Sequence, residues 1–228
     1  MILNENLHSI KDEIADIQSK QNLGHFVEIV AATKTRSFQT IKDIYECGVR
    51  HIGENRIQEA YQKFGPFDSM PNITKRFIGH LQTNKVNKCL ELFDTIDSVD
   101  SIKLAEKINN RLIHLKKRIP ILLEINTSGD KNKKGFSPEI NEDFFSIFNL
   151  ENIEIMGLMT MGPLSQGEKE TRESFTLLRE TKDLINSQLT NQSIQELSMG
   201  MSGDYRIGVQ EGSTMIRVGT KLFGKRNY

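Results

Sequence analysis

Short apolar runs alternate with amphipathic segments along most of the chain. The apolar runs have the length and the β-branched content of buried strands, whereas the segments between them place apolar residues at helical spacing. The pattern predicts strands within residues 26–33, 49–53, 76–79, 95–99, 119–126, 153–159, 196–199 and 215–218. It predicts helices over about 3–20, 37–47, 54–64, 85–92, 101–115, 141–148, 168–189 and 205–210.

Eight strands alternating with helices are the element count of a (β/α)8 barrel. Such a TIM barrel is an α/β fold with a parallel sheet, and here it would form a single domain over residues 1–228 with an extra helix before the first strand. A doubly wound open sheet is the competing arrangement. Its dinucleotide-binding form is disfavoured, because no Gly-x-Gly-x-x-Gly follows the first predicted strand.

Composition and charge exclude several broad classes of protein. Thirty basic residues balance thirty acidic ones among 228, so no overall field attracts nucleic acid or an anionic membrane. The basic run 131–134 lies in a polar segment and is expected to be a solvated loop. Neither a signal peptide nor a membrane-length apolar run is expected, and Cys47 and Cys89 lack metal-ligand spacing. We therefore expect a cytoplasmic protein with free thiols, no metal site, and no exposed apolar feature that would demand oligomerisation beyond a monomer.

Lys34 is the first candidate for chemistry, because it ends the most apolar of the early strands. Ligands of parallel α/β folds bind at the carboxyl ends of the strands. An amine held against apolar walls has a lowered pKa, and its neutral form can attack a carbonyl to give a Schiff base. The alternative is a surface lysine that caps the strand.

The segments after the last two strands suggest a phosphate site. Residues 199–203 contain Ser202, and the segment after Val218 contains Gly219 and Thr220. In (β/α)8 barrels these two loops often hold a phosphate, with backbone N–H groups and hydroxyls as donors. The alternative is that glycine and serine only form tight turns.

Three further polar residues follow or interrupt predicted strands. Arg217 alternates with two apolar neighbours, so a buried guanidinium there needs either a structural carboxylate or a ligand acceptor such as a pyridine nitrogen. Asn55 and His80 follow strand ends and could line the same mouth. We expect His80 to be a wall residue or hydrogen-bond donor rather than a general base, because no carboxylate at a telling spacing orients it.

Seven blocks of the sequence, in order, resemble the pyridoxal phosphate homeostasis proteins, also called the proline synthetase co-transcribed family. The blocks are residues 31–35, 51–55, 77–85, 126–129, 157–160, 197–202 and 216–220, with Phe223-Gly224 after the last. The resemblance implies a barrel similar to the N-terminal domain of alanine racemase that binds pyridoxal 5′-phosphate (PLP).

The resemblance also assigns roles to individual residues. Lys34 falls on the lysine that forms the Schiff base with PLP, and Arg217 on the arginine that faces the pyridine nitrogen. Ser202, Gly219 and Thr220 fall on the phosphate cradle, with Met201 adjacent, and Asn55 and His80 lie in blocks near the ring.

Three functions remain open at this point. The first is a non-catalytic PLP carrier that buffers the cofactor and hands it to PLP-dependent apo-enzymes. The second is a weak amino-acid racemase, which is disfavoured because no second base is evident and about ten residues follow the last strand. The third is a lysine-dependent aldolase acting on sugar phosphates, which shares the barrel, the Schiff base and the phosphate loops.

Overall fold

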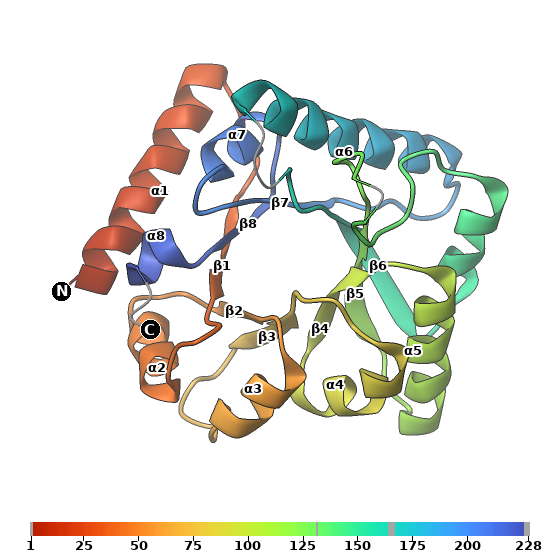
Figure 1. Ribbon diagram of the computed structural model, residues 1–228, viewed down its shortest axis with the longest axis horizontal. Helices are drawn as coiled ribbons and strands as arrows, with labels where there is room; N and C mark the ends of the chain where they lie inside the picture. The colour runs from red at the N-terminus through yellow and green to blue at the C-terminus, as the bar shows by residue number, and fades with distance from the viewer. Residues whose placement is uncertain (1, 131, 164–166, 226–228) are drawn as a thin grey trace.

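The computed structural model describes residues 2–130, 132–163 and 167–225. Eight parallel strands, each paired with the next and the last with the first, form a closed barrel (Figure 1). The strands are β1 (Glu28–Ala32), β2 (His51–Glu54), β3 (Thr74–Phe77), β4 (Thr95–Val99), β5 (Ile119–Glu124), β6 (Ile153–Met159), β7 (Glu196–Met201) and β8 (Met215–Val218). The predicted (β/α)8 barrel is confirmed, and the open-sheet alternative is wrong.

Helices surround the barrel, and each strand is followed by at least one of them. They are α2 (Phe38–Glu46), α3 (Ile57–Lys63), η1 (Thr83–Lys85), α4 (Val86–Leu92), α5 (Ile102–Leu115), η2 (Glu142–Asn149), α6 (Glu168–Gln188), α7 (Tyr205–Gln210) and α8 (Thr220–Phe223). Ser37 and Ser101 cap α2 and α5 by accepting the backbone N–H three residues later. The alternation of strands and helices in the barrel therefore follows from the order of apolar and amphipathic segments along the chain.

The extra helix α1 (Ile2–Gln21) precedes the first strand, as predicted. It lies along the outside of the barrel beside α7 and α8 (Figure 1), burying Leu7, Ile10, Ile14 and Ile17. Glu13 strengthens this contact, since its carboxylate accepts hydrogen bonds from Tyr205, Arg206 and Lys221. α1 therefore holds the segment that connects the last two strands.

The core consists of two layers. Apolar side chains fill the space between strands and helices, and a smaller group of Val30, Leu122, Met156, Met159 and Met215 fills the barrel interior. The methionines at 156 and 159 are packing residues, while Met161 is 42% exposed.

Several predicted boundaries are wrong by a few residues. β2 begins later than predicted, and β3 begins earlier. β5 ends at Glu124, before its predicted end, and β7 continues past its predicted end to Met201. Phe26 precedes β1 and is 77% exposed, so the apolar character of residues 26–27 does not mark strand. η2 is a 3₁₀ helix, and α3 begins at Ile57 because Glu54 is the last residue of a strand rather than the start of a helix.

Part of the basic run 131–134 lies outside the described residues, namely Lys131. Lys133 does not belong to a freely solvated loop, because its ammonium donates to the carbonyls of Met161 and Gly162 at 3.3 and 2.9 Å. Cys47 and Cys89 are free thiols, as predicted. No helix among the described residues is long and apolar enough to cross a membrane.

Candidate functional site

Lys34 lies just beyond the carboxyl end of β1, where the sequence places it, and its side chain is half-buried. The closure of the barrel brings the end of β8 to the same place. Ala31 pairs with Val218, so Gly219 lies beside Ala32, two residues before Lys34. A methyl group built on Gly219 would lie 3.4 Å from the Ala32 carbonyl oxygen. The lysine and the predicted phosphate loop therefore belong to neighbouring strand ends.

Arg217 points into the barrel, on the opposite face of β8 from Ile216 and Val218, which pack under α1 and α7. Its guanidinium donates to the Ser198 carbonyl at 2.8 Å, to the Ser198 hydroxyl at 2.6 Å and to the Thr160 carbonyl at 2.7 Å. Burial lowers the pKa of the guanidinium. The charges of Asp97, Glu124 and Asp204 act in the opposite direction, so carboxylates also favour the charged guanidinium.

The loops after β7 and β8 meet at Ser202. The Ser202 hydroxyl oxygen accepts the backbone N–H of Gly219 at 3.0 Å and that of Lys221 at 3.2 Å. Met201 ends β7 beside Arg217, and its N–H donates to Asp204 at 2.5 Å. Thr220 is exposed and begins α8. The two loops, which the sequence placed only separately, are thus joined by two hydrogen bonds to the Ser202 hydroxyl oxygen.

Asn55 follows β2, the other neighbour of β1. Its side-chain carbonyl oxygen is shielded from solvent and has no hydrogen-bond partner among the described residues. A buried acceptor without a donor costs free energy, and such groups are rare in native structures. Asn55 therefore offers an unpartnered acceptor just beyond the carboxyl end of β2, the strand that pairs with β1.

His80 lies farther round the barrel, after β3, and its side chain is 49% exposed. Its Nδ1 lies 3.1 Å from a carboxylate oxygen of Asp100, which follows β4 and is nearly buried. This partner was missed, and the expectation that no carboxylate orients His80 is wrong. Because β3 and β4 are adjacent and parallel, the residues after their ends could have been paired from the strand order.

Two buried carboxylates at strand ends were also missed. Glu54 ends β2, and Glu124 ends β5; burial raises the pKa of both. Glu54 forms an ion pair with Lys63 of α3 and accepts a hydrogen bond from the Thr33 hydroxyl. An acidic residue at the end of an apolar strand was the available signal, but Glu54 was assigned to the following helix.

The predicted residues fall into two groups. Lys34, Met201, Ser202, Arg217, Gly219 and Thr220 come from β1, β7 and β8, which are consecutive around the closed sheet, and Asn55 follows β2 on the other side of β1. His80 stands apart, after β3. All eight lie at or beyond the carboxyl-terminal part of their strands.

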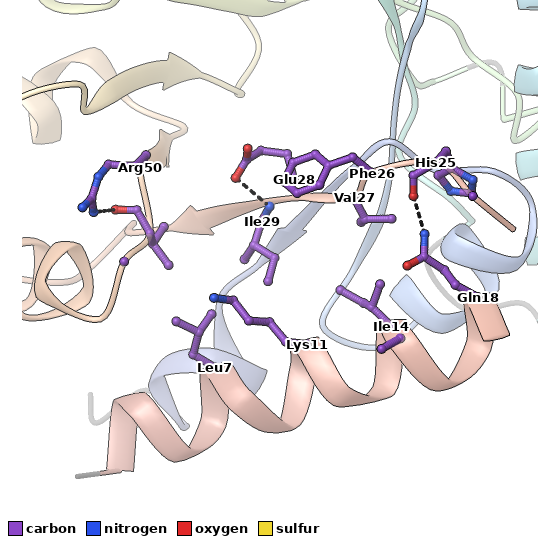
Figure 2. Close-up of a pocket in the computed structure, with 14 residues that line it drawn as sticks. Leu7, Lys11, Ile14, Gln18, His25, Phe26, Val27, Glu28, Ile29 and Arg50 are labelled. Atoms are coloured by element: carbon purple, nitrogen blue, oxygen red, sulfur yellow. Dashed lines mark hydrogen bonds between the residues drawn. The ribbon is translucent and has the colours of Figure 1, made fainter.

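A large cavity elsewhere in the molecule contains none of these residues. It measures about 710 Å³ and lies between α1 and the amino-terminal end of β1 (Figure 2). Leu7 and Ile14 of α1 face Val27 and Ile29 across it, and Lys11 points into it. In barrel enzymes this end of the strands contributes stability rather than chemistry, so the strand ends opposite are the candidate site.

Comparisons with known proteins show the family of this chain. A family model described as the alanine racemase N-terminal domain matches residues 6–227. The pyridoxal phosphate homeostasis protein of Synechocystis is 40% identical over 201 residues, covering 88% of this chain and 92% of the relative. The chain belongs to the pyridoxal phosphate homeostasis protein family.

Solved structures extend the comparison. PipY of Synechococcus elongatus, whose structure has PLP bound, superposes with a TM-score of 0.85 at 33% identity, covering 97% of this chain and all of that one. An alanine racemase of Clostridium difficile superposes with a TM-score of 0.74 at 18% identity, covering 100% of this chain and 60% of that one, which shows a shared fold. The family resemblance drawn from the seven sequence blocks is confirmed.

Proposed function

We propose that this protein binds pyridoxal 5′-phosphate reversibly, holds it as a Schiff base on Lys34, and buffers or delivers it to PLP-dependent enzymes in the cytoplasm. The observation that carries the proposal is the position of Lys34, at the end of β1 and beside the β8 loop that contains Gly219. Support comes from a relative 33% identical over nearly the whole chain, which is described with PLP bound. In this proposal the protein acts as a monomer.

The residues present fit the three parts of this cofactor. The Lys34 amine supplies the nucleophile for the aldehyde, and Arg217 is the donor toward the ring nitrogen. Ser202, Gly219 and Thr220 supply a hydroxyl and backbone N–H groups for the phosphate, with Met201 beside them. The unpartnered carbonyl of Asn55 and the imidazole of His80 are the remaining groups assigned to the ring.

When bound, PLP supplies an aldehyde that condenses with the lysine and a ring that can withdraw electrons. Strong withdrawal requires a carboxylate that keeps the ring nitrogen protonated. A guanidinium stays charged at every physiological pH and cannot accept a proton, so Arg217 would leave that nitrogen unprotonated. The site is therefore suited to holding the cofactor rather than to driving broad chemistry with it.

The second candidate function, a weak amino-acid racemase, is favoured by the His80–Asp100 pair. A carboxylate 3.1 Å from Nδ1 is the arrangement that orients a histidine as a base. If His80 acts in this way, incubating the protein with PLP and one enantiomer of an amino acid in deuterated water gives protein-dependent exchange at the α-carbon. His80→Gln would abolish that exchange. If the parent protein shows no such exchange, the racemase function is refuted and the carrier function remains.

The test of the proposed function is the visible absorption spectrum before and after adding PLP, with borohydride trapping. The parent protein gains a Schiff-base band and a trapped adduct, and Lys34→Ala gains neither while its circular dichroism is unchanged. Lys11→Ala, which removes an exposed lysine at the opposite end of the barrel, is the matched control and keeps the band. A parent protein without a band in excess PLP would refute the proposal and favour a sugar-phosphate aldolase.

A further inference from the structure

A second lysine, Lys63, contacts the turn that contains Lys34. Lys63 ends α3, and its side chain is only 12% exposed. Its ammonium donates to the backbone carbonyl of Thr33 at 2.7 Å and to a carboxylate oxygen of Glu59 at 3.2 Å, and it forms an ion pair with the buried Glu54. Three donors of one ammonium thus meet three oxygens, one of which belongs to the residue immediately before Lys34.

The residue immediately after Lys34 is tied to the same group. The backbone N–H of Thr35 donates to Glu59, whose carboxylate also accepts from Lys63. Thr35 has a φ of +65°, a left-handed conformation that β-branched residues rarely adopt. Backbone held in such a conformation needs surrounding contacts that fix it, and it is found most often at functional sites. Here Glu59 supplies such a contact.

Lys63, Glu54 and Glu59 form a network with two halves, one on each side of Lys34. Lys63 and Glu54 hold Thr33 through its carbonyl and hydroxyl oxygens, and Glu59 holds Thr35 through its amide. The turn also closes on itself, since the N–H of Arg36 donates to the Thr33 carbonyl at 2.9 Å. The Thr33 carbonyl therefore accepts from both Arg36 and Lys63, one donor for each of its lone pairs.

We propose that Lys63 is a positioning residue, which fixes the turn containing Lys34 and thereby sets the rate at which Lys34 condenses with an aldehyde. The inference rests on the proposed function of Lys34. In that condensation the lysine nitrogen bonds to the aldehyde carbon and the aldehyde oxygen leaves as water, so no oxidant or reductant is required. Displacing a reacting group by about 1 Å can slow a reaction by roughly a hundredfold, so fixing the base of the side chain matters.

The experiment compares Glu54→Gln with the double variant Glu54→Gln, Lys63→Met. Both lack the buried carboxylate charge, so the double variant does not leave Glu54 charged and unpaired. They differ only at Lys63, whose ammonium holds Thr33 and also contacts Glu59. Two quantities are measured: hydrogen exchange at the Thr35 amide without PLP, and, with PLP, the rate of Schiff-base formation beside the total PLP bound.

We expect faster exchange at Thr35 and roughly tenfold slower Schiff-base formation in the double variant, with total PLP binding retained through the phosphate loops. Lys63→Arg, which keeps the charge and the donors, should recover most of the rate. Equal exchange and equal rates in the two glutamine-containing variants would overturn the inference while leaving the function of Lys34 intact. A parent protein that forms no Schiff base would overturn both.

If the double variant does not fold, the Glu59 half of the network decides the question. Glu59→Gln keeps an oxygen that can accept the Thr35 N–H, whereas Glu59→Ala removes it. Slower Schiff-base formation in Glu59→Ala than in Glu59→Gln supports the inference that the turn must be fixed. Equal rates in these two variants would contradict it.

Discussion

Gly79 connects the stability of the barrel to the position of a predicted site residue. It lies just beyond β3, and a methyl group built on it would be 2.3 Å from the Asn55 carbonyl oxygen and 2.7 Å from the Asn55 Cα. Its φ is not in the left-handed region, so an alanine there is opposed by space and not by backbone conformation. Gly79→Ala therefore pushes the ends of β2 and β3 apart.

The magnitude follows from the shortfall in distance. Ordinary contacts between such atoms are about 3.5 Å, so roughly 1 Å of movement is required, and the obstacle is backbone rather than a flexible side chain. Overpacking of this kind costs about 1–3 kcal/mol, and backbone obstruction places Gly79→Ala near the upper end, at about 3 kcal/mol. For a chain of this length such a loss lowers Tm by roughly 6–12 °C.

Chemical and thermal denaturation of Gly79→Ala and Gly24→Ala test this reasoning. Gly24 has no atom within 4 Å of a built methyl group and does not have a positive φ, so its alanine variant should stay within about 0.5 kcal/mol of the parent. Because Asn55 is displaced, PLP titration should also show weaker binding by Gly79→Ala alone. Equal stability of the two variants would refute the argument.

Two further predictions concern buried and partly buried charges. Arg217→Ala leaves the Thr160 carbonyl without the Arg217 donor, while the Ser198 carbonyl keeps the Thr160 N–H. It should lower stability by about 1–3 kcal/mol, weaken PLP binding and shift its absorption; an unchanged spectrum and affinity would remove the ring-nitrogen role. Hydrogen bonds from Arg206, Tyr205 and Lys221 lower the pKa of Glu13 from 4.5 to about 2, against the opposing effect of burial. Because the folded pKa is depressed, the stabilisation is present above about pH 4.5 and is lost as the pH falls toward 2. Urea unfolding should therefore show Glu13→Gln less stable than the parent at pH 7, with a difference that shrinks over this range, and a difference independent of pH would contradict the assignment.

The fold could be predicted because the information that specifies it is local. Strand length, helical spacing and serine caps are all properties of a few consecutive residues, and Ser37 and Ser101 cap two of the helices. The errors have an equally local cause. Phe26 extends an apolar run without being buried, and Glu54 resembles the acidic start of a helix although it ends a strand.

The site could be predicted to the extent that strand direction determines it. Alternation along β8 turns Arg217 inward, and the end of β1 places Lys34 at the mouth, so these two residues could be chosen from one strand each. The shared position of Ser202 and Gly219 additionally required barrel closure, which only the eight-strand count predicts. Asp100 was missed although it follows a correctly predicted strand, because pairing it with His80 requires the order of neighbouring strands.

The contacts that Lys63 makes with Thr33 and Glu54 could not be predicted from strand direction or helical spacing. Lys63 reaches back from the end of α3 to the end of β1, two elements that do not pair in the sheet, and its ammonium must find Thr33 and Glu54 at once. A lysine in the last turn of a helix is ordinarily a favourable charge at the negative end of the helix dipole. Only the burial of its side chain and the oxygens around it distinguish Lys63 from such a residue. A strand end can be read from the sequence, but the contacts that hold the strand end in place depend on the path of the chain between the two elements.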